Sequence, residues 1–258
     1  MLTAITVTRL EKAATDNGFD LERERTVDWL SFGSSQTSMH IWLAAVGESR
    51  FLAAASRADV IDGLAGLGTA CADPLPSVAA GALAVSDVAA LHRLLRRAFQ
   101  LSRTLPDALL RTFEDETAHR PRATEAERLV VQRIGQDVFR QGLLEYWDGR
   151  CAMTGLDVPE LLRASHIKPW ADCATDAERL DVFNGLLLAP HLDAAFDAGF
   201  ITIADDGTML VSNTLGPSAR SALGLQRALK VDGLHGAHKA YLLWHRAQVF
   251  CSGAETAG

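Results

Sequence analysis

The residues best suited to chemistry lie in one short stretch of the chain, between residues 163 and 197. Its first piece, residues 163–170, reads RASHIKPW and places His166 shortly before a proline. The second piece, residues 184–188, reads NGLLL and begins with Asn184. The third piece, residues 190–197, reads PHLDAAFD and contains His191, Asp193 and Asp197. Imidazole, amide and carboxylate groups therefore occur together in this stretch.

Hydrolysis of a phosphodiester bond requires groups of these kinds. A water molecule must lose a proton beside the phosphorus, and a neutral histidine suits that task. A divalent cation stabilises the charge that develops on the phosphate and on the leaving oxygen. Mg²⁺ prefers oxygen ligands, whereas imidazole together with carboxylate also admits Mn²⁺ or Zn²⁺. An asparagine amide can bond backbone on both sides of a loop and fix the strand that presents the base.

The local pattern predicts strand, loop, strand and helix in that order. Residues 163–168 suit a short strand that ends near a proline, and Asn184 suits a turn before an apolar strand. Pro190 suits the first position of a helix, because a missing backbone N–H costs nothing there. Such an arrangement would collect the imidazole and the carboxylates in one small region.

Residues 150–212 resemble the HNH endonuclease family, in the subgroup with a ββα-metal (His-finger) core. The resemblance rests on GRCAMTG at 149–155, ASHIKPW at 164–170, NGLLL at 184–188 and FD at 196–197. The stretch 200–211, with its turn at Asp205-Asp206-Gly207, and the segment 240–250 also look like the family. The similarity extends over roughly residues 124–250 and does not cover residues 1–110. Each tripeptide alone is a weak signal, and the combination carries the resemblance.

The resemblance implies a role for each matching residue. His166 matches the general base, and Asn184 matches the residue that holds the loop. The metal ligand on the following helix is Asp193, which lies nine residues after Asn184, or His191, two residues earlier. Many relatives have a second ligand directly before the base, whereas this chain has Ser165, a poor ligand. The implied cofactor is a divalent metal, Mg²⁺ before Mn²⁺ or Zn²⁺.

Other residues of this half receive simpler interpretations. No structural zinc is expected, because Cys151 and Thr154 stand where relatives with two CxxC pairs have the first pair. Asp197 is interpreted as a residue that bonds backbone, and Trp170 as one that closes the loop. The histidines at 235, 238 and 245 are interpreted as surface or packing residues. Candidate phosphate contacts, with loop structure as the alternative, are Arg150, Arg163 and Lys168.

The rest of the chain predicts an α+β protein with two domains. Residues 1–110 suit a small α/β module, with a helix at 2–16, strands at 27–32, 41–46 and 50–55, and a helix beginning at Ser56. Residues 70–86 suit a linker, an amphipathic helix is expected at 87–101, and a short helix is expected at 106–119. Residues 120–122, Arg-Pro-Arg, suggest the boundary. Residues 120–250 then form the nuclease domain, which begins with a capping box at 124–127.

Bulk properties limit the possible partners. The net charge is −7, but residues 174–213 carry seven acids against Arg179, while 91–111 and 214–250 are each basic. An acidic patch between basic stretches suits a metal site beside phosphate contacts, and equally suits ordinary solvated helices. The four cysteines are widely spaced, and the first ten residues lack the apolar core of a signal peptide. A cytoplasmic protein with no membrane span is therefore expected.

These observations favour a metal-dependent endonuclease that cuts double-stranded DNA. The module at 1–110 suggests a restriction-type enzyme in which it senses a sequence or a modified base, by analogy of architecture alone. The main alternative is a catalytically inactive HNH-fold DNA-binding protein, which Ser165 favours. A toxin nuclease with an immunity partner is a third hypothesis. A homodimer is possible, because double-strand cutting by a single site often requires two copies.

Overall fold

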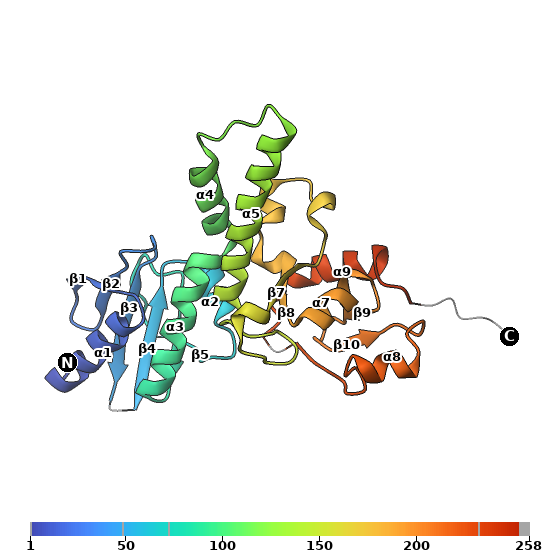
Figure 1. Cartoon of the computed structure of the whole chain (residues 1–258). Helices are drawn as coiled ribbons and strands as arrows, with labels where there is room; N and C mark the ends of the chain where they lie inside the picture. The colour runs from blue at the N-terminus through green and yellow to red at the C-terminus, as the bar shows by residue number, and fades with distance from the viewer. Residues whose placement is uncertain (1, 48, 72, 232, 253–258) are drawn as a thin grey trace. The chain divides into compact units, whose positions relative to one another are not determined.

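The computed structural model describes residues 2–47, 49–71, 73–231 and 233–252 (Figure 1). The chain divides into two compact units, Met1–Leu105 and Pro106–Gly258. This division precedes helix α4 (Pro106–Thr117), whereas the sequence suggests a boundary at 120–122. The difference arises because α4 packs against α5 (Glu125–Tyr146), so it belongs to the second unit.

The first unit is a six-stranded antiparallel sheet with the strand order β1-β2-β3-β4-β6-β5. Helices α1 and α3 lie along one face of it (Figure 1), where the apolar stripe of α3 is buried. The strands are β1 (Leu21–Arg25), β2 (Leu30–Gly33), β3 (Ile41–Val46), β4 (Arg50–Ala55), β5 (Thr69–Ala70) and β6 (Gly81–Val85). The helices are α1 (Ala4–Asp16), α2 (Ala58–Gly63) and α3 (Val88–Thr104).

The segment 70–86 is not the linker that its composition suggests. Residues Gly81–Val85 form β6, which pairs with β4 along its whole length and places Ala82 and Ala84 in the core. Alanine has low strand propensity, but its small side chain allows close packing, so pairing with β4 overrides the local preference. Strand β1 was also not expected, because all five of its residues are exposed.

Two further boundaries differ from the sequence expectation. The predicted strand at 27–32 begins later, as β2 at Leu30. Ser56 does not cap α2: its Oγ accepts a hydrogen bond of 3.1 Å from the His40 backbone, and Arg57 occupies the cap position without a side-chain hydrogen bond to the backbone of the first turn. A hydroxyl bonded across the sheet is therefore unavailable to the helix that follows it in sequence.

The second unit begins with the helical hairpin α4–α5, whose second helix starts with a complete capping box. The Thr124 hydroxyl accepts from the Glu127 backbone, and the Glu127 carboxylate accepts from the Thr124 backbone at 2.8 Å. Gly135 of α5 allows close packing, since a Cβ there would lie 2.6 Å from the Trp170 ring. The predicted start of this helix thus agrees with the structure, and its glycine lets a loop side chain pack against the helix.

A strand–strand–helix unit follows α5 and carries the candidate site. Strands β7 (Arg163–His166) and β8 (Gly185–Leu188) pair antiparallel, and helix α7 (Pro190–Asp197) follows directly. The hairpin of β9 (Ile201–Ile203) and β10 (Met209–Val211) comes next. The remaining helices are η1 (Pro159–Leu161), η2 (Trp170–Asp172), α6 (Asp176–Arg179), η3 (Val182–Asn184), α8 (Pro217–Ala222) and α9 (His238–Gln248).

The mixture of helix and sheet agrees with the predicted α+β class. Among the described residues, no helix combines the length and the apolar character that crossing a membrane demands.

Candidate active site

A pocket beside β7 brings together an imidazole, two carboxylates and an arginine of the second unit. Its volume is about 460 Å³, and its walls come from β7, the loop after it, α7 and α9. Strand β7 pairs with β8 in the register Ser165 with Leu186 and His166 with Gly185, which holds β7 next to the start of α7. The polar residues that line the pocket are Arg163, Ser165, His166, Asp193, Asp197 and His245.

His166 lies at the end of β7 with its ring fixed on three sides. The ring stacks on Phe139 of α5 at 3.8 Å between centroids, and meets the edge of Trp170 at 5.7 Å. Its Nε2 lies 2.9 Å from the Arg179 carbonyl oxygen. A carbonyl only accepts, so Nε2 carries the proton and Nδ1 carries the lone pair. Burial lowers the pKa of His166 to about 4, which keeps this imidazole neutral at pH 7.

No hydrogen bond to His166 Nδ1 is found within the described part of the chain. His166 is one of the residues that line the pocket. A neutral imidazole with one nitrogen bonded to backbone and the other unengaged has the form that a general base needs.

Asn184 is fully buried and ties together the loop between β7 and β8. Its Oδ1 accepts from the Lys168 backbone at 2.8 Å, and its Nδ2 donates to the Lys168 and Glu178 carbonyls at 3.1 and 3.2 Å. Its own carbonyl accepts from the Ile167 backbone at 2.9 Å. The amide thus holds the residues that directly follow His166.

Arg179 holds the same loop from its outer side. Its guanidinium donates to the carbonyls of Trp170 and Cys173 and to the carboxylate of Asp176. The Arg179 carbonyl is the acceptor for His166, so the loop that Arg179 fixes also orients the imidazole. The sequence does not indicate this role of Arg179, because a carbonyl acceptor leaves no pattern in side-chain types.

Two carboxylates of α7 face this pocket, one helical turn apart. Ser165 donates its hydroxyl to Asp197 at 3.4 Å, and its proximity to Asp193 lowers the pKa of that carboxyl. Partial burial raises the pKa of both carboxyls, and repulsion from Asp193 raises that of Asp197 further. The Arg163 charge opposes this effect at Asp193. A positive charge between the two carboxylates would offset both the burial of these groups and the repulsion between them.

Asp197 was interpreted from the sequence as a residue that bonds backbone; its hydrogen bond in the structure is to the Ser165 hydroxyl. Its spacing of four residues from Asp193 was the available signal, since residues i and i+4 share a helix face. His191, the alternative ligand, is exposed and does not line the pocket. The helix starts at Pro190, so His191 and Asp193 project in different directions.

The residues present fit a Mg²⁺-class ion rather than a cage made by protein alone. Among the described residues, no group of three or more His, Cys, Asp or Glu side chains is arranged to hold a metal. Mg²⁺ retains several waters and commonly binds through one or two carboxylates together with substrate phosphates. The pair Asp193 and Asp197, with carboxyls of raised pKa, supplies that smaller number of oxygen ligands.

The three predicted phosphate contacts are placed differently. Lys168 forms an ion pair with Glu178 at 2.6 Å, and Arg150 forms an exposed pair with Asp157 at 3.2 Å. Arg163 is exposed and lines the pocket itself. The structure therefore brings Arg163, but not the other two, to the wall that contains the carboxylates.

Comparison with known families agrees with the resemblance noted in the sequence. A family model described as HNH endonuclease matches residues 151–204, in the C-terminal half of the chain. The matched segment contains His166, Asn184, Asp193 and Asp197, and stops before α9. A comparison with curated proteins gives no match. An HNH segment is thereby identified in the second unit, and a nuclease function is indicated at the level of the family.

Proposed function

We propose that this protein is a metal-dependent endonuclease that hydrolyses phosphodiester bonds of double-stranded DNA. One observation carries the proposal: within the segment that matches the HNH endonucleases, His166, Asp193 and Asp197 line a common pocket. An imidazole alone in a strand is ordinary, whereas an oriented, neutral imidazole opposite two carboxylates is the set that phosphate hydrolysis needs.

His166 acts as the general base at its Nδ1 atom. The lone pair there accepts a proton from water, while the Nε2 proton remains bonded to the Arg179 carbonyl. That carbonyl also stabilises the imidazolium once the proton has moved. The pKa of about 4 ensures the neutral form before reaction, and the charge of an arriving phosphate shifts the pKa upward, toward the value that a base requires.

Asp193 and Asp197 are the residues that would hold the cation. When bound, a Mg²⁺-class ion supplies charge stabilisation to the phosphate and to the leaving oxygen. Ser165 donates its hydroxyl to Asp197 and lowers the pKa of the neighbouring Asp193 carboxyl, so it lies between the two carboxylates and helps to orient them. Arg163, exposed on the same wall, is suited to contact a phosphate of the bound strand.

Nicking of supercoiled plasmid with Mg²⁺ or Mn²⁺ tests this proposal. We expect His166→Ala and Asp197→Asn each to lower the nicking rate by at least about 100-fold, because the first removes the proposed base and the second a proposed ligand of the cation. The matched control is His191→Ala. His191 lies on α7, as Asp197 does, but outside the pocket, so this variant should nick like wild type. Wild-type rates for His166→Ala would exclude this mechanism, and a slow His191→Ala would instead assign the ligand role to His191.

A second candidate is a DNA-binding protein that retains the fold without activity. It is favoured by Ser165, which stands where relatives have a ligand, and by the small number of protein donors at the pocket. Calorimetric titration of the full chain with Mn²⁺, followed by DNA binding in a gel shift, separates the two candidates. DNA binding without metal binding and without nicking would establish the second candidate.

We further propose that the first unit selects the DNA target, as in restriction-type enzymes, and that the protein acts in the cytoplasm. The support for target selection is the division into two compact units, of which the second contains the family match. The location in the cytoplasm is proposed from the sequence, whose first ten residues lack the apolar core of a signal peptide. Plasmids with and without modified bases are the substrates for the test. Equal cleavage of modified, unmodified and random-sequence DNA would remove the recognition role.

A further inference from the structure

His245 of α9 is a buried imidazole that also borders the pocket, although it lies outside the matched segment. Only 1% of the residue is exposed. Its ring stacks on Phe196 at 3.8 Å between centroids, with an interplanar angle of 13°. Phe196 lies on α7 between the two carboxylate residues. His245 therefore contacts the element that presents the candidate cation ligands.

Both ring nitrogens of His245 are engaged, and their partners fix the tautomer. Nε2 lies 3.1 Å from the Phe196 carbonyl, which can only accept, so Nε2 is the donor. Nδ1 then accepts from the hydroxyl of Thr202, a buried residue of β9, at 2.9 Å. His245 has no lone pair left for acid–base work. It joins the last turn of α7 to the neighbouring hairpin.

The helix α9 is held against this region by other contacts as well. Arg246 donates to the Ile203 carbonyl and to Asp205, both at 2.6 Å, and so fixes α9 to the same hairpin. One turn before His245, the hydroxyl of Tyr241 donates to Asp181 at 2.9 Å, on the side of the Asn184 turn. Of these three side chains of α9, His245 is the one that bonds α7, the helix of the carboxylates.

We propose that His245 is a positioning residue that sets the geometry of Asp193 and Asp197 for cation binding, an inference that rests on the proposed metal-dependent function. The Phe196 carbonyl belongs to the peptide bond that links Phe196 to Asp197. A donor on that carbonyl, combined with a ring stacked on Phe196, restricts the rotation and tilt of the last turn of α7. Residues behind metal ligands act in this way, and their loss typically weakens metal affinity by about 10- to 100-fold.

Two substitutions separate positioning from simple packing. His245→Phe keeps a ring that can stack on Phe196 but removes both hydrogen bonds. His245→Gln offers an amide N–H for the Phe196 carbonyl and an amide oxygen for the Thr202 hydroxyl. Tyr241→Phe is the matched control, since it removes one partly buried hydrogen bond from the same helix without touching α7.

The experiment is Mn²⁺ binding to the full chain, measured by electron paramagnetic resonance without DNA, with thermal unfolding of the metal-free proteins alongside. We expect His245→Phe to weaken Mn²⁺ binding by about 10- to 100-fold, His245→Gln to recover part of it, and Tyr241→Phe to bind like wild type at a comparable loss of thermal stability. His166→Ala should also bind normally.

Equal Mn²⁺ affinity in wild type and both His245 variants would overturn the positioning role while leaving the nuclease proposal intact. Equal weakening in His245→Phe and Tyr241→Phe would also overturn it, by showing a general effect of instability. If the His245→Phe protein does not fold, His245→Gln decides: it lacks the stacked ring, so weaker Mn²⁺ binding than in the wild type is expected, and wild-type affinity would overturn the positioning role. Absence of Mn²⁺ binding in the wild type would overturn both this inference and the metal-dependent function.

Discussion

Two imidazoles of the second unit have nearly the same surroundings and differ in the hydrogen bonding of one ring nitrogen, Nδ1. His166 and His245 each stack on a phenylalanine at 3.8 Å, and each donates Nε2 to a backbone carbonyl. Nδ1 of His245 accepts from Thr202, whereas Nδ1 of His166 has no hydrogen bond within the described residues. This difference supports the proposed roles, a general base for His166 and a positioning residue for His245.

The sequence predicts a catalytic role for His166, which stays a prediction, and a surface or packing role for His245, whose ring is buried and packed on Phe196. It does not indicate which residues the His245 ring bonds. His166 stands in a motif, with Asn184 and Asp193 at family spacing. His245 was interpreted as a surface or packing residue, and its bond to a backbone carbonyl of α7 depends on tertiary contacts between segments 49 residues apart. Such a partner cannot be read from residue types, since every residue has a carbonyl.

The buried histidines predict an acid-sensitive fold. Burial lowers the pKa of His166 and His245 to about 4 from 6.5, so between these pH values the unfolded chain binds protons that the folded chain excludes. The free energy of unfolding should therefore be maintained above pH 6.5 and fall on acidification toward pH 4. Each histidine contributes at most about 1.4 kcal/mol per pH unit to this slope.

Urea unfolding of the metal-free protein at pH 7, 6, 5 and 4.5 measures that slope. In His245→Phe the total stability is lower, but one titrating group is gone, so the slope over this interval should be shallower than in the wild type. An identical slope in the variant would show that His245 does not stay neutral in the folded protein.

At the scale of elements, the sequence succeeded where local pattern and tertiary pairing agree. Strands β3 and β4 have the predicted residues, because alternation and a Gly-containing turn specify the hairpin locally. The ββα order of the site was predicted from Pro190 and the apolar run before it. Strand β6 was missed, because an alanine-rich segment becomes a strand only through its partner β4.

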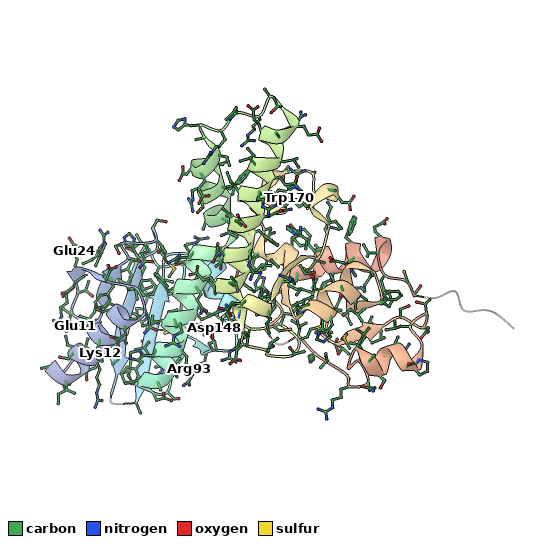
Figure 2. All side chains as sticks on the ribbon, in the orientation of Figure 1. Glu11, Lys12, Glu24, Arg93, Asp148 and Trp170 are labelled. Atoms are coloured by element: carbon green, nitrogen blue, oxygen red, sulfur yellow. The ribbon has the colours of Figure 1, made fainter. Side chains whose placement is uncertain are left out.

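Helix α5 contains a position where two elementary effects oppose each other. Alanine in place of a helical glycine usually stabilises by about 0.5–1 kcal/mol. At Gly135, however, the new Cβ would lie 2.6 Å from the Trp170 ring and 3.3 Å from Phe113. Overpacking of this kind costs about 1–3 kcal/mol. Trp170, labelled in Figure 2, also packs edge-on against His166, so its displacement reaches the site.

We therefore expect Gly135→Ala to destabilise the protein by about 1 kcal/mol or more, since the clash exceeds the gain in helix propensity. Chemical unfolding measures the change, and a double-mutant cycle identifies its cause. In a Trp170→Leu background the same alanine should be neutral or stabilising. Destabilisation of equal size in both backgrounds would place the strain elsewhere.

At the scale of the whole molecule, the net charge of −7 makes DNA binding depend on local features. The pocket combines Arg163 with two carboxylates, so without a cation this wall repels a phosphate more than it attracts one. A bound divalent ion would make the net charge of these three side chains and the ion positive, so that the wall would attract a phosphate. Metal and DNA should therefore bind cooperatively, which also favours nicking only when both are present.

In the proposed function, the pocket beside β7 is the active site of one chain, and one active site would cut one strand at a time. Two outcomes follow for duplex DNA. If the protein acts as a monomer, linear plasmid arises only from independent nicks, and nicked circles accumulate first. If two copies meet on the target, linear product appears without that intermediate, and its initial rate rises with about the second power of protein concentration, as mass action requires.

We expect the second outcome if the proposed restriction role is correct, because a lone nick in foreign DNA leaves the duplex intact. A concentration series on supercoiled plasmid, with nicked and linear forms quantified at early times, distinguishes the two. His166→Ala mixed in excess with wild type supplies the control: in a dimer it converts linear product into nicked circles, since half of each pair is inactive. A monomer would show only dilution, and first-order dependence with accumulated nicks would argue for a nicking enzyme.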